Sequence, residues 1–407
     1  MNEQAYSEDT LAILLACSRL AIGKSLPKLR PLADADWSIV TERLQASDLK
    51  RPGALLGKSE AELRESLGLG GETSARIVAL LSRGGQLAIE LERLSSLGIW
   101  VMTRADEEYP KRLKKRLGQR SPVVLFGMGA RRLLSTAGVA IVGSRDLDDG
   151  GLRYATEAGR RAANGGYTVY SGASRGADAA AMGGAVSSSG TAVGVLSEGL
   201  IRSLRDHDAT QHVLDGSLCL TSPFDPDITF RAGNAMARNK IVYCLADVAL
   251  IVSSSSRTGG TWAGATEAVR AKWIPVYVRG GEGAPPGNRD LIAEGCLPAP
   301  FDPGTARDDF MRWLSEQIAS RNGERSSLQH PISAGPVFDA VWPILAPFLE
   351  TARPASEVAD QFGLDRKQAT DWLLRAVHQG LASHDDGRFQ TIDKRPKVGE
   401  QQTLELE

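Results

Sequence analysis

Residues 139–145 read Val-Ala-Ile-Val-Gly-Ser-Arg, a short apolar run that passes directly into a small-residue turn and an arginine. Such a run is typical of a strand that is buried on both faces of a parallel sheet. Backbone N–H groups in the turn and the next helix can face an anion, and Arg145 adds a bidentate donor. The stretch predicts a phosphate site, although a generic strand-to-helix turn with a solvated arginine explains it equally well by itself.

A second loop of similar design follows the apolar run at residues 168–170. Residues 171–178 read Ser-Gly-Ala-Ser-Arg-Gly-Ala-Asp, and we interpret Asp178 as the N-cap of a helix over 179–186. Because ligands bind at the carboxyl ends of strands in open α/β sheets, we expect the arginines of both loops to converge on one crevice. The candidate residues in the two loops are Gly143, Ser144, Arg145, Ser171, Gly172, Arg175 and Gly176.

Further apolar runs at 191–196, 248–252 and 274–278 alternate with helical stretches. This alternation predicts an α/β fold with an extended Rossmann-like parallel sheet. A third phosphate-cradle design, rich in hydroxyls and glycine, follows the 248–252 run, and a basic helix precedes it. The candidates there are Arg238, Asn239, Lys240, Arg257, Thr258, Gly259, Gly260 and Thr261. For single basic residues on a helix, a solvated face is the commoner explanation.

Domains of different character flank the predicted sheet. Ser59 and Glu62 have the spacing of a capping box, and residues 67–77 resemble a helix-hairpin-helix, in which the hairpin either meets a DNA phosphate or only packs. Near the other end, three helical stretches over 338–348, 355–362 and 366–379 and a hairpin around Asp386-Gly387 resemble a winged helix. The predicted order is a SAM- or helix-hairpin-helix-like helical domain over 1–100, a Rossmann-like domain over 101–315, a linker over 316–335, a winged-helix-like domain over 336–392 and a tail over 393–407.

Composition excludes several classes of protein. The 407 residues contain 48 Lys and Arg against 49 Asp and Glu, so any anion site is local rather than a general positive charge. No apolar stretch is long enough to cross a membrane, and the N-terminus lacks an export signal, so we expect a cytoplasmic protein without a membrane partner. The four cysteines are far apart without a C-x-x-C pair, which predicts no metal site, and no motif predicts a cofactor.

Taken together, these motifs resemble the DNA-processing protein A family, also called DprA or Smf. The Gly-Ser-Arg turn, the S-G-x-x-R-G-x-D loop, the R-N-K-I stretch at 238–241 and the G-N-R-D-L-I stretch at 287–292 occur in the family's order. The resemblance implies a homodimer that binds single-stranded DNA in a basic crevice and helps a RecA-type recombinase in DNA recombination and natural transformation. It implies phosphates near Arg145, Arg175 and Lys240, with Arg238 and Arg257 at the rim.

The chain departs from the family pattern at some positions, as a divergent member would. Residues 253–256 are four serines where the family usually has an acidic and a small residue, and Ala237 stands where an arginine is common. The crevice offers no nucleophile with an adjacent base, which predicts a protein that is not an enzyme. Six basic residues between 111 and 120 are either a solvated connector or a basic rim of the DNA path.

Two other functions remain open from the sequence. One is a nucleotide phosphoribohydrolase-like enzyme, because Gly259-Gly260-Thr261 with Glu267 resembles that class's G-G-x-G-T-x-x-E loop, although the spacing differs. The other is a DNA sensor or neutralising partner protein in a bacterial defence or toxin–antitoxin module.

Overall fold

The computed structural model describes residues 6–22, 28–281, 283–300, 307–322, 341–364, 366–378, 381–385 and 387–391. The chain divides into two compact units, residues 1–329 and residues 330–407. The predicted tail over 393–407 and residues 323–335 of the predicted linker lie outside the described residues. Residues 316–322 of that linker are helical instead, because α13 spans Arg307–Asn322 and contributes the buried side chain of Ile318 to the core.

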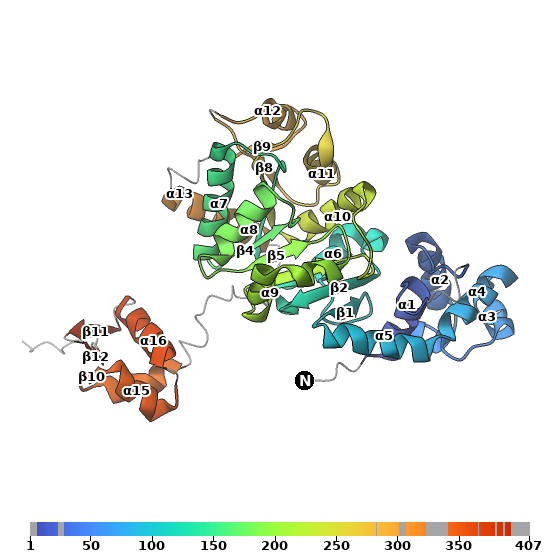
Figure 1. The fold of residues 1–407 in the computed structure, drawn as a ribbon, viewed down its shortest axis with the longest axis horizontal. Helices are drawn as coiled ribbons and strands as arrows, with labels where there is room; N and C mark the ends of the chain where they lie inside the picture. The colour runs from blue at the N-terminus through green and yellow to red at the C-terminus, as the bar shows by residue number, and fades with distance from the viewer. Residues whose placement is uncertain are drawn as a thin grey trace, which may run out of the picture. The chain divides into compact units, whose positions relative to one another are not determined.

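A sheet flanked by helices forms the centre of the first unit (Figure 1). It has nine strands in the order β1-β2-β6-β5-β4-β3-β7-β8-β9. The strands are β1 (Trp100–Thr103), β2 (Val124–Gly129), β3 (Gly138–Val142), β4 (Thr168–Ser171), β5 (Ala192–Val195), β6 (Leu218–Ser222), β7 (Val248–Ile251), β8 (Val276–Val278) and β9 (Leu297–Pro298). All neighbours from β6 to β9 are parallel. Strands β1 and β2 pair antiparallel at one edge, so the sheet is mostly rather than wholly parallel.

Helices surround this sheet and precede it. The α-helices of the unit are α1 (Glu8–Cys17), α2 (Asp34–Ala46), α3 (Glu60–Leu67), α4 (Gly71–Leu81), α5 (Gly84–Ser96), α6 (Lys111–Leu117), α7 (Asp149–Asn164), α8 (Ala177–Val186), α9 (His207–Leu214), α10 (Ala232–Leu245), α11 (Gly259–Arg270), α12 (Pro286–Ala293) and α13. Short 3₁₀ helices are η1 (Pro52–Leu55), η2 (Gly118–Arg120), η3 (Arg131–Ser135) and η4 (Leu200–Arg205).

Alternate residues of the central strands pack into two different cores. In β3, Val139 and Ile141 belong to the core that α7 and α8 cover. Ala140 and Val142 belong to the core that α6, α10 and α11 cover. The apolar run at residues 139–142 is therefore continuous, because both faces of its strand are buried.

The N-terminal helices share a core with the sheet. Leu14 and Leu44 of the helices pack in the same hydrophobic cluster as Val101 and Phe126 of β1 and β2. The expected capping box at Ser59 is present, since its hydroxyl accepts from the amide of Glu62 and its own amide donates to the Glu62 carboxylate. A domain boundary at residue 100 within this unit stays a prediction.

The second unit has its own small core and sheet. Strands β10 (Arg353–Pro354), β12 (Arg388–Thr391) and β11 (Ala382–Asp385) pair antiparallel in that order. Residues 341–345, η6 (Ala346–Leu349), α15 (Ala355–Phe362) and α16 (Arg366–His378) are helical, and Gly363 ends α15 in the left-handed conformation with φ 63°. No helix in the described part of the chain is long and apolar enough for a membrane span.

Candidate functional site

The strand order reverses beside β3, which has β4 on one side and β7 on the other. A pocket of about 730 Å³, here called the switch-point pocket, opens at the carboxyl end of β3, where such a reversal leaves a crevice. Ten of the fifteen predicted site residues line it: Gly143, Ser144, Arg145, Arg238, Asn239, Arg257, Thr258, Gly259, Gly260 and Thr261. The loops after β3 and β7 thus meet in one pocket, whereas the sequence predicted that Arg145 and Arg175, from the loops after β3 and β4, share a crevice.

Close backbone contacts hold the loops of this pocket together. The amide of Ser144 donates to the carbonyl of Ser253 over 3.0 Å, and the amide of Ala177 donates to the carbonyl of Ser144 over 3.2 Å. Gly176 has φ 82°, and a Cβ there would lie 2.5 Å from the Ser144 carbonyl oxygen. Only glycine allows this approach without strain, so Gly176 shapes the pocket although it does not line it.

The N-terminus of α11 faces the pocket. Thr258 is the N-cap residue but its side chain accepts no capping hydrogen bond, and Gly259, Gly260 and Thr261 begin the helix. The first amides of a helix have no partner within it and carry a partial positive charge, which favours an anion. Arg257, exposed and in the left-handed conformation with φ 53°, lies directly before them.

Arg238 forms part of the floor of the pocket rather than its rim. Its side chain is only 3% exposed, it donates to the hydroxyl of Ser174 over 3.2 Å, and its buried Nε has no hydrogen-bond partner among the described residues. Burial lowers the pKa of Arg238, and the nearby charge of Asp178 acts in the opposite direction. The expected rim position and the solvated alternative are therefore both wrong.

Asp178 is not the N-cap of its helix. Gly176 holds that position, and Asp178 lies in the first turn of α8, where its carboxylate accepts from the amide of Ser174 over 3.3 Å. Burial raises the pKa of Asp178. A Cβ on Gly172 would overlap the Arg238 guanidinium and approach the Asp178 carboxylate, so this glycine makes room for both charged groups.

The other predicted residues lie outside the switch-point pocket. Gly172 and Arg175 line a neighbouring cavity of about 630 Å³, here called the Arg175 pocket, which also includes Arg145. Lys240 lines a different, smaller pocket with Arg120 and Asp34. Ser171 is buried and donates to the carbonyl of Ile141 over 2.6 Å, so its hydroxyl is internal.

Asn288 has a structural role beside the pocket that its position in the 287–292 motif did not predict. Its amide group donates to the carbonyls of Val252 and Arg279 over 3.1 and 2.9 Å and accepts from the amide of Ser254 over 2.9 Å. It is 1% exposed. The Gly-Asn-Arg-Asp motif therefore positions the loop after β7, and its place in a motif was the only signal for this.

Two of the six basic residues at positions 111–120, between β1 and β2, have structural roles. Arg112 donates to the carbonyl of Leu245 and lies 3.5 Å from the carboxylate of Asp247, while Arg116 donates to the carbonyls of Cys244 and Ala246. Asp247 also accepts from the amide of Gly138. These two arginines fix the end of α10 against β3 and are not available to a ligand.

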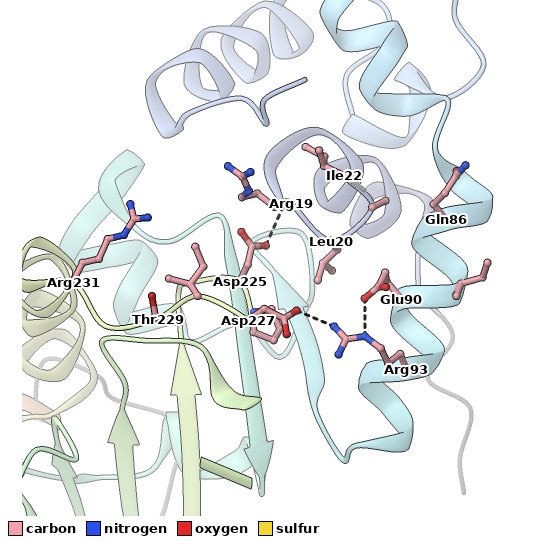
Figure 2. Close-up of a pocket in the computed structure, with 14 residues that line it drawn as sticks. Arg19, Leu20, Ile22, Gln86, Glu90, Arg93, Asp225, Asp227, Thr229 and Arg231 are labelled. Carbon is pink, nitrogen blue, oxygen red and sulfur yellow. Dashed lines mark hydrogen bonds and ion pairs between the residues drawn. The ribbon is translucent and has the colours of Figure 1, made fainter. Parts of the chain in front are cut away.

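A larger cavity of about 870 Å³ lies between the N-terminal helices and the loop after β6, as Figure 2 shows. Arg93 contacts Glu90 and Asp227 over 2.9 and 3.0 Å, and the amide of Arg19 donates to Asp225 over 3.0 Å (Figure 2). Three carboxylates and three arginines line this cavity, so it has no excess of positive groups. The switch-point pocket has three arginines against two carboxylates, and it includes the N-terminus of α11.

The geometry so far defines a class: a mostly parallel α/β protein with a pocket at the switch point of its sheet that arginines and a helix N-terminus line. Residues 100–297 match the model of the family described as DNA recombination-mediator protein A. No group of His, Cys, Asp and Glu in the described part of the chain is arranged to hold a metal ion.

The chain is also similar to individual proteins, and it spans about half the length of the curated relatives it matches. The chain is 28% identical over 216 residues to the protein assigned as DNA processing protein DprA in Mycobacterium tuberculosis H37Rv, covering 50% of this chain and 56% of that relative. The structure of DNA processing protein A from Streptococcus pneumoniae is similar over 76% of this chain and 98% of that chain, with TM-score 0.53 and 18% identity, which shows the fold. That from Helicobacter pylori, described for its binding of single-stranded DNA, covers 54% of this chain and 97% of its own, with TM-score 0.46 and 21% identity.

Proposed function

We propose that the protein binds single-stranded DNA in the switch-point pocket and acts in DNA processing and recombination. One observation carries the proposal: Arg145, Arg257 and the N-terminus of α11 line the same pocket. Guanidinium groups and free helix amides are the donors that bind phosphate oxygens, and they bind them without reading the base. The match of residues 100–297 to a family of DNA recombination mediators supports DNA, rather than a small anion, as the ligand.

A single strand suits the pocket better than a duplex. The side chains of Met236, which is 57% exposed, and Trp262 line the same pocket as the phosphate donors. Unpaired bases present apolar faces to such side chains, whereas the bases of a duplex are stacked on each other. The same pocket therefore offers donors to the backbone and apolar contacts to the bases of one strand.

We further propose that the protein acts without catalysis. The carboxylates that line the switch-point pocket are Asp146 and Asp178, and Asp178 is buried beside Arg238. Glu267, the acid that a phosphoribohydrolase would need, does not line the pocket. Incubation with nucleoside monophosphates is expected to release no free base, and base release that Glu267→Gln abolishes would contradict this.

The proposed partners follow from the family and from the second unit. We propose a cytoplasmic homodimer that delivers DNA to a RecA-type recombinase. The two helices and three-stranded sheet of the second unit support a winged-helix domain, which would contact a partner protein or bind duplex DNA weakly. The sensor or neutralising role in a defence module has no observation that favours it.

Binding of a fluorescent oligothymidylate tests the proposal. Arg145→Ala and Arg257→Ala are expected to weaken binding about equally for every base composition, because both side chains contact phosphate. Arg153→Ala is the matched control, because Arg153 is exposed on α7 and lines none of the pockets described above. Full binding by both pocket variants would overturn the assignment of the site.

A further inference from the structure

Phe230 is an aromatic residue that lines both the switch-point pocket and the Arg175 pocket. It lies in the loop between β6 and α10, next to the N-cap residue Arg231, and lines both pockets together with Arg145 and Ser174. Its side chain is 43% exposed. A large apolar side chain at this exposure adds little to the core, so its ring remains available to a ligand.

The ring of Phe230 also contacts the phosphate donor. The guanidinium carbon of Arg145 lies 5.4 Å from the ring centroid, within the range of a cation–π contact. This contact places an aromatic ring beside a cation that faces both pockets. A nucleotide presents the complementary pair of groups: a flat base that can stack on the ring and a phosphate that can bind the cation.

The Arg175 pocket can hold a second phosphate. Three guanidinium groups, those of Arg145, Arg175 and Arg202, line it against the carboxylates of Glu198 and Asp206. Arg202 contacts Glu198 over 3.1 Å, with 63% of the arginine side chain exposed. Arg175 contacts Asp146, which is outside this pocket, over 2.9 Å, with 73% of the arginine side chain exposed. Ion pairs this exposed are weak, so a phosphate can replace the carboxylate partner.

We propose that one single strand of DNA crosses Phe230 from the switch-point pocket into the Arg175 pocket. One base stacks on the ring of Phe230, and its flanking phosphates bind Arg145 on one side and Arg202 on the other. Stacking on an aromatic ring tolerates every base, because every base has a flat π face. This inference rests on the proposed function, to which it adds a second subsite and a stacking residue.

An abasic strand separates stacking from phosphate binding. The affinities of an oligothymidylate and of an abasic strand of the same length are measured for wild type, Phe230→Ala and Phe230→Tyr. Wild type and Phe230→Tyr are expected to bind the thymidine strand more tightly than the abasic strand, and stacking on residue 230 should account for roughly 5- to 100-fold of this preference. Phe230→Ala is expected to lose that part of the preference. Leu214→Ala, at an apolar residue that is 74% exposed and lines neither pocket, is the control.

The outcomes are distinct. If Phe230 acted only by holding Arg145, then Phe230→Ala would weaken the binding of both strands equally, and the stacking proposal would be wrong. Equal affinity of wild type for the two strands would also overturn it, while DNA binding itself would still stand. If wild type bound neither strand, the proposed function would fail and the inference with it.

Arg202 tests the second subsite independently of the ring. Arg202→Ala is expected to weaken the binding of both strands, because its contact is to phosphate. Arg205→Ala is the matched control, since Arg205 is exposed on the same 3₁₀ helix but does not line the Arg175 pocket. Equal affinity of the two variants would show that the strand does not enter the Arg175 pocket.

Discussion

Replacement of Arg238 by methionine should lower stability rather than only affinity. Arg238 and Asp178 are 3% and 6% exposed. Arg238 is the cation whose charge lowers the pKa of Asp178 and so favours the ionised carboxylate. Methionine fills much of the same volume but removes the charge and the hydrogen bond to Ser174. Asp178 would then be a buried carboxylate without a cation.

The expected cost follows from the burial of both groups. Removal of one partner from a buried pair costs about 3–5 kcal/mol, because the other charge stays buried and uncompensated. Each kcal/mol lowers the melting temperature of a unit this large by about 2 °C, so a loss of roughly 6–10 °C is expected. Thermal unfolding at pH 7 measures it, with Arg145→Met, at an exposed arginine of the same pocket, as the control.

The pH dependence identifies Asp178 as the cause. Burial raises the pKa of Asp178 in the folded protein, and loss of Arg238 raises it further. The folded variant therefore binds a proton more readily than the unfolded chain, so its deficit should shrink as the pH falls from 7 toward 4. Addition of Asp178→Asn should restore most of the lost stability at pH 7. A variant as stable as Arg145→Met would refute this reasoning.

Three further predictions concern the rest of the first unit. Arg112→Ala should destabilise the protein by about 1–3 kcal/mol in denaturant unfolding, because the buried Leu245 carbonyl loses a donor and Asp247 keeps only its longer contact to Arg116, whereas the exposed Lys115→Ala should change little. Burial raises the pKa of Asp225 to about 6, so wild type should gain melting temperature relative to Asp225→Asn as the pH falls from 7 to 4, and parallel pH profiles would contradict this. Gly176→Ala should weaken DNA binding in an affinity titration, because a Cβ would displace the carbonyl oxygens of the turn after β3; unchanged affinity would argue against that coupling.

Local patterns predicted the centre of the sheet but not its antiparallel edge. The run at 139–142 is buried on both faces, so its composition alone indicates a central strand. Strand β1 pairs with β2, and β2 pairs with β6. The pairing of β2 with β6 joins residues that are far apart in the chain. Short apolar stretches such as 100–103 do not reveal which partner they meet.

The same limit applies to the basic residues. Arg238 and Lys240 are two positions apart on α10, yet one forms part of the floor of the switch-point pocket and the other lines a different pocket. The helix has apolar residues on more than one side, so its periodicity did not show which side packs inward. Arg112 and Arg116 bind carbonyls more than a hundred residues away, which no local pattern contains.

The salt dependence of single-strand binding tests the central claim most directly. Each phosphate contact releases counterions, so the logarithm of the binding constant should fall linearly with the logarithm of salt concentration. We predict that Arg145→Ala reduces the steepness of this line by about 0.7, the value for one phosphate contact on a single strand, while Arg153→Ala leaves it unchanged. A slope that Arg145→Ala does not change would contradict the assignment of the switch-point pocket as the phosphate site.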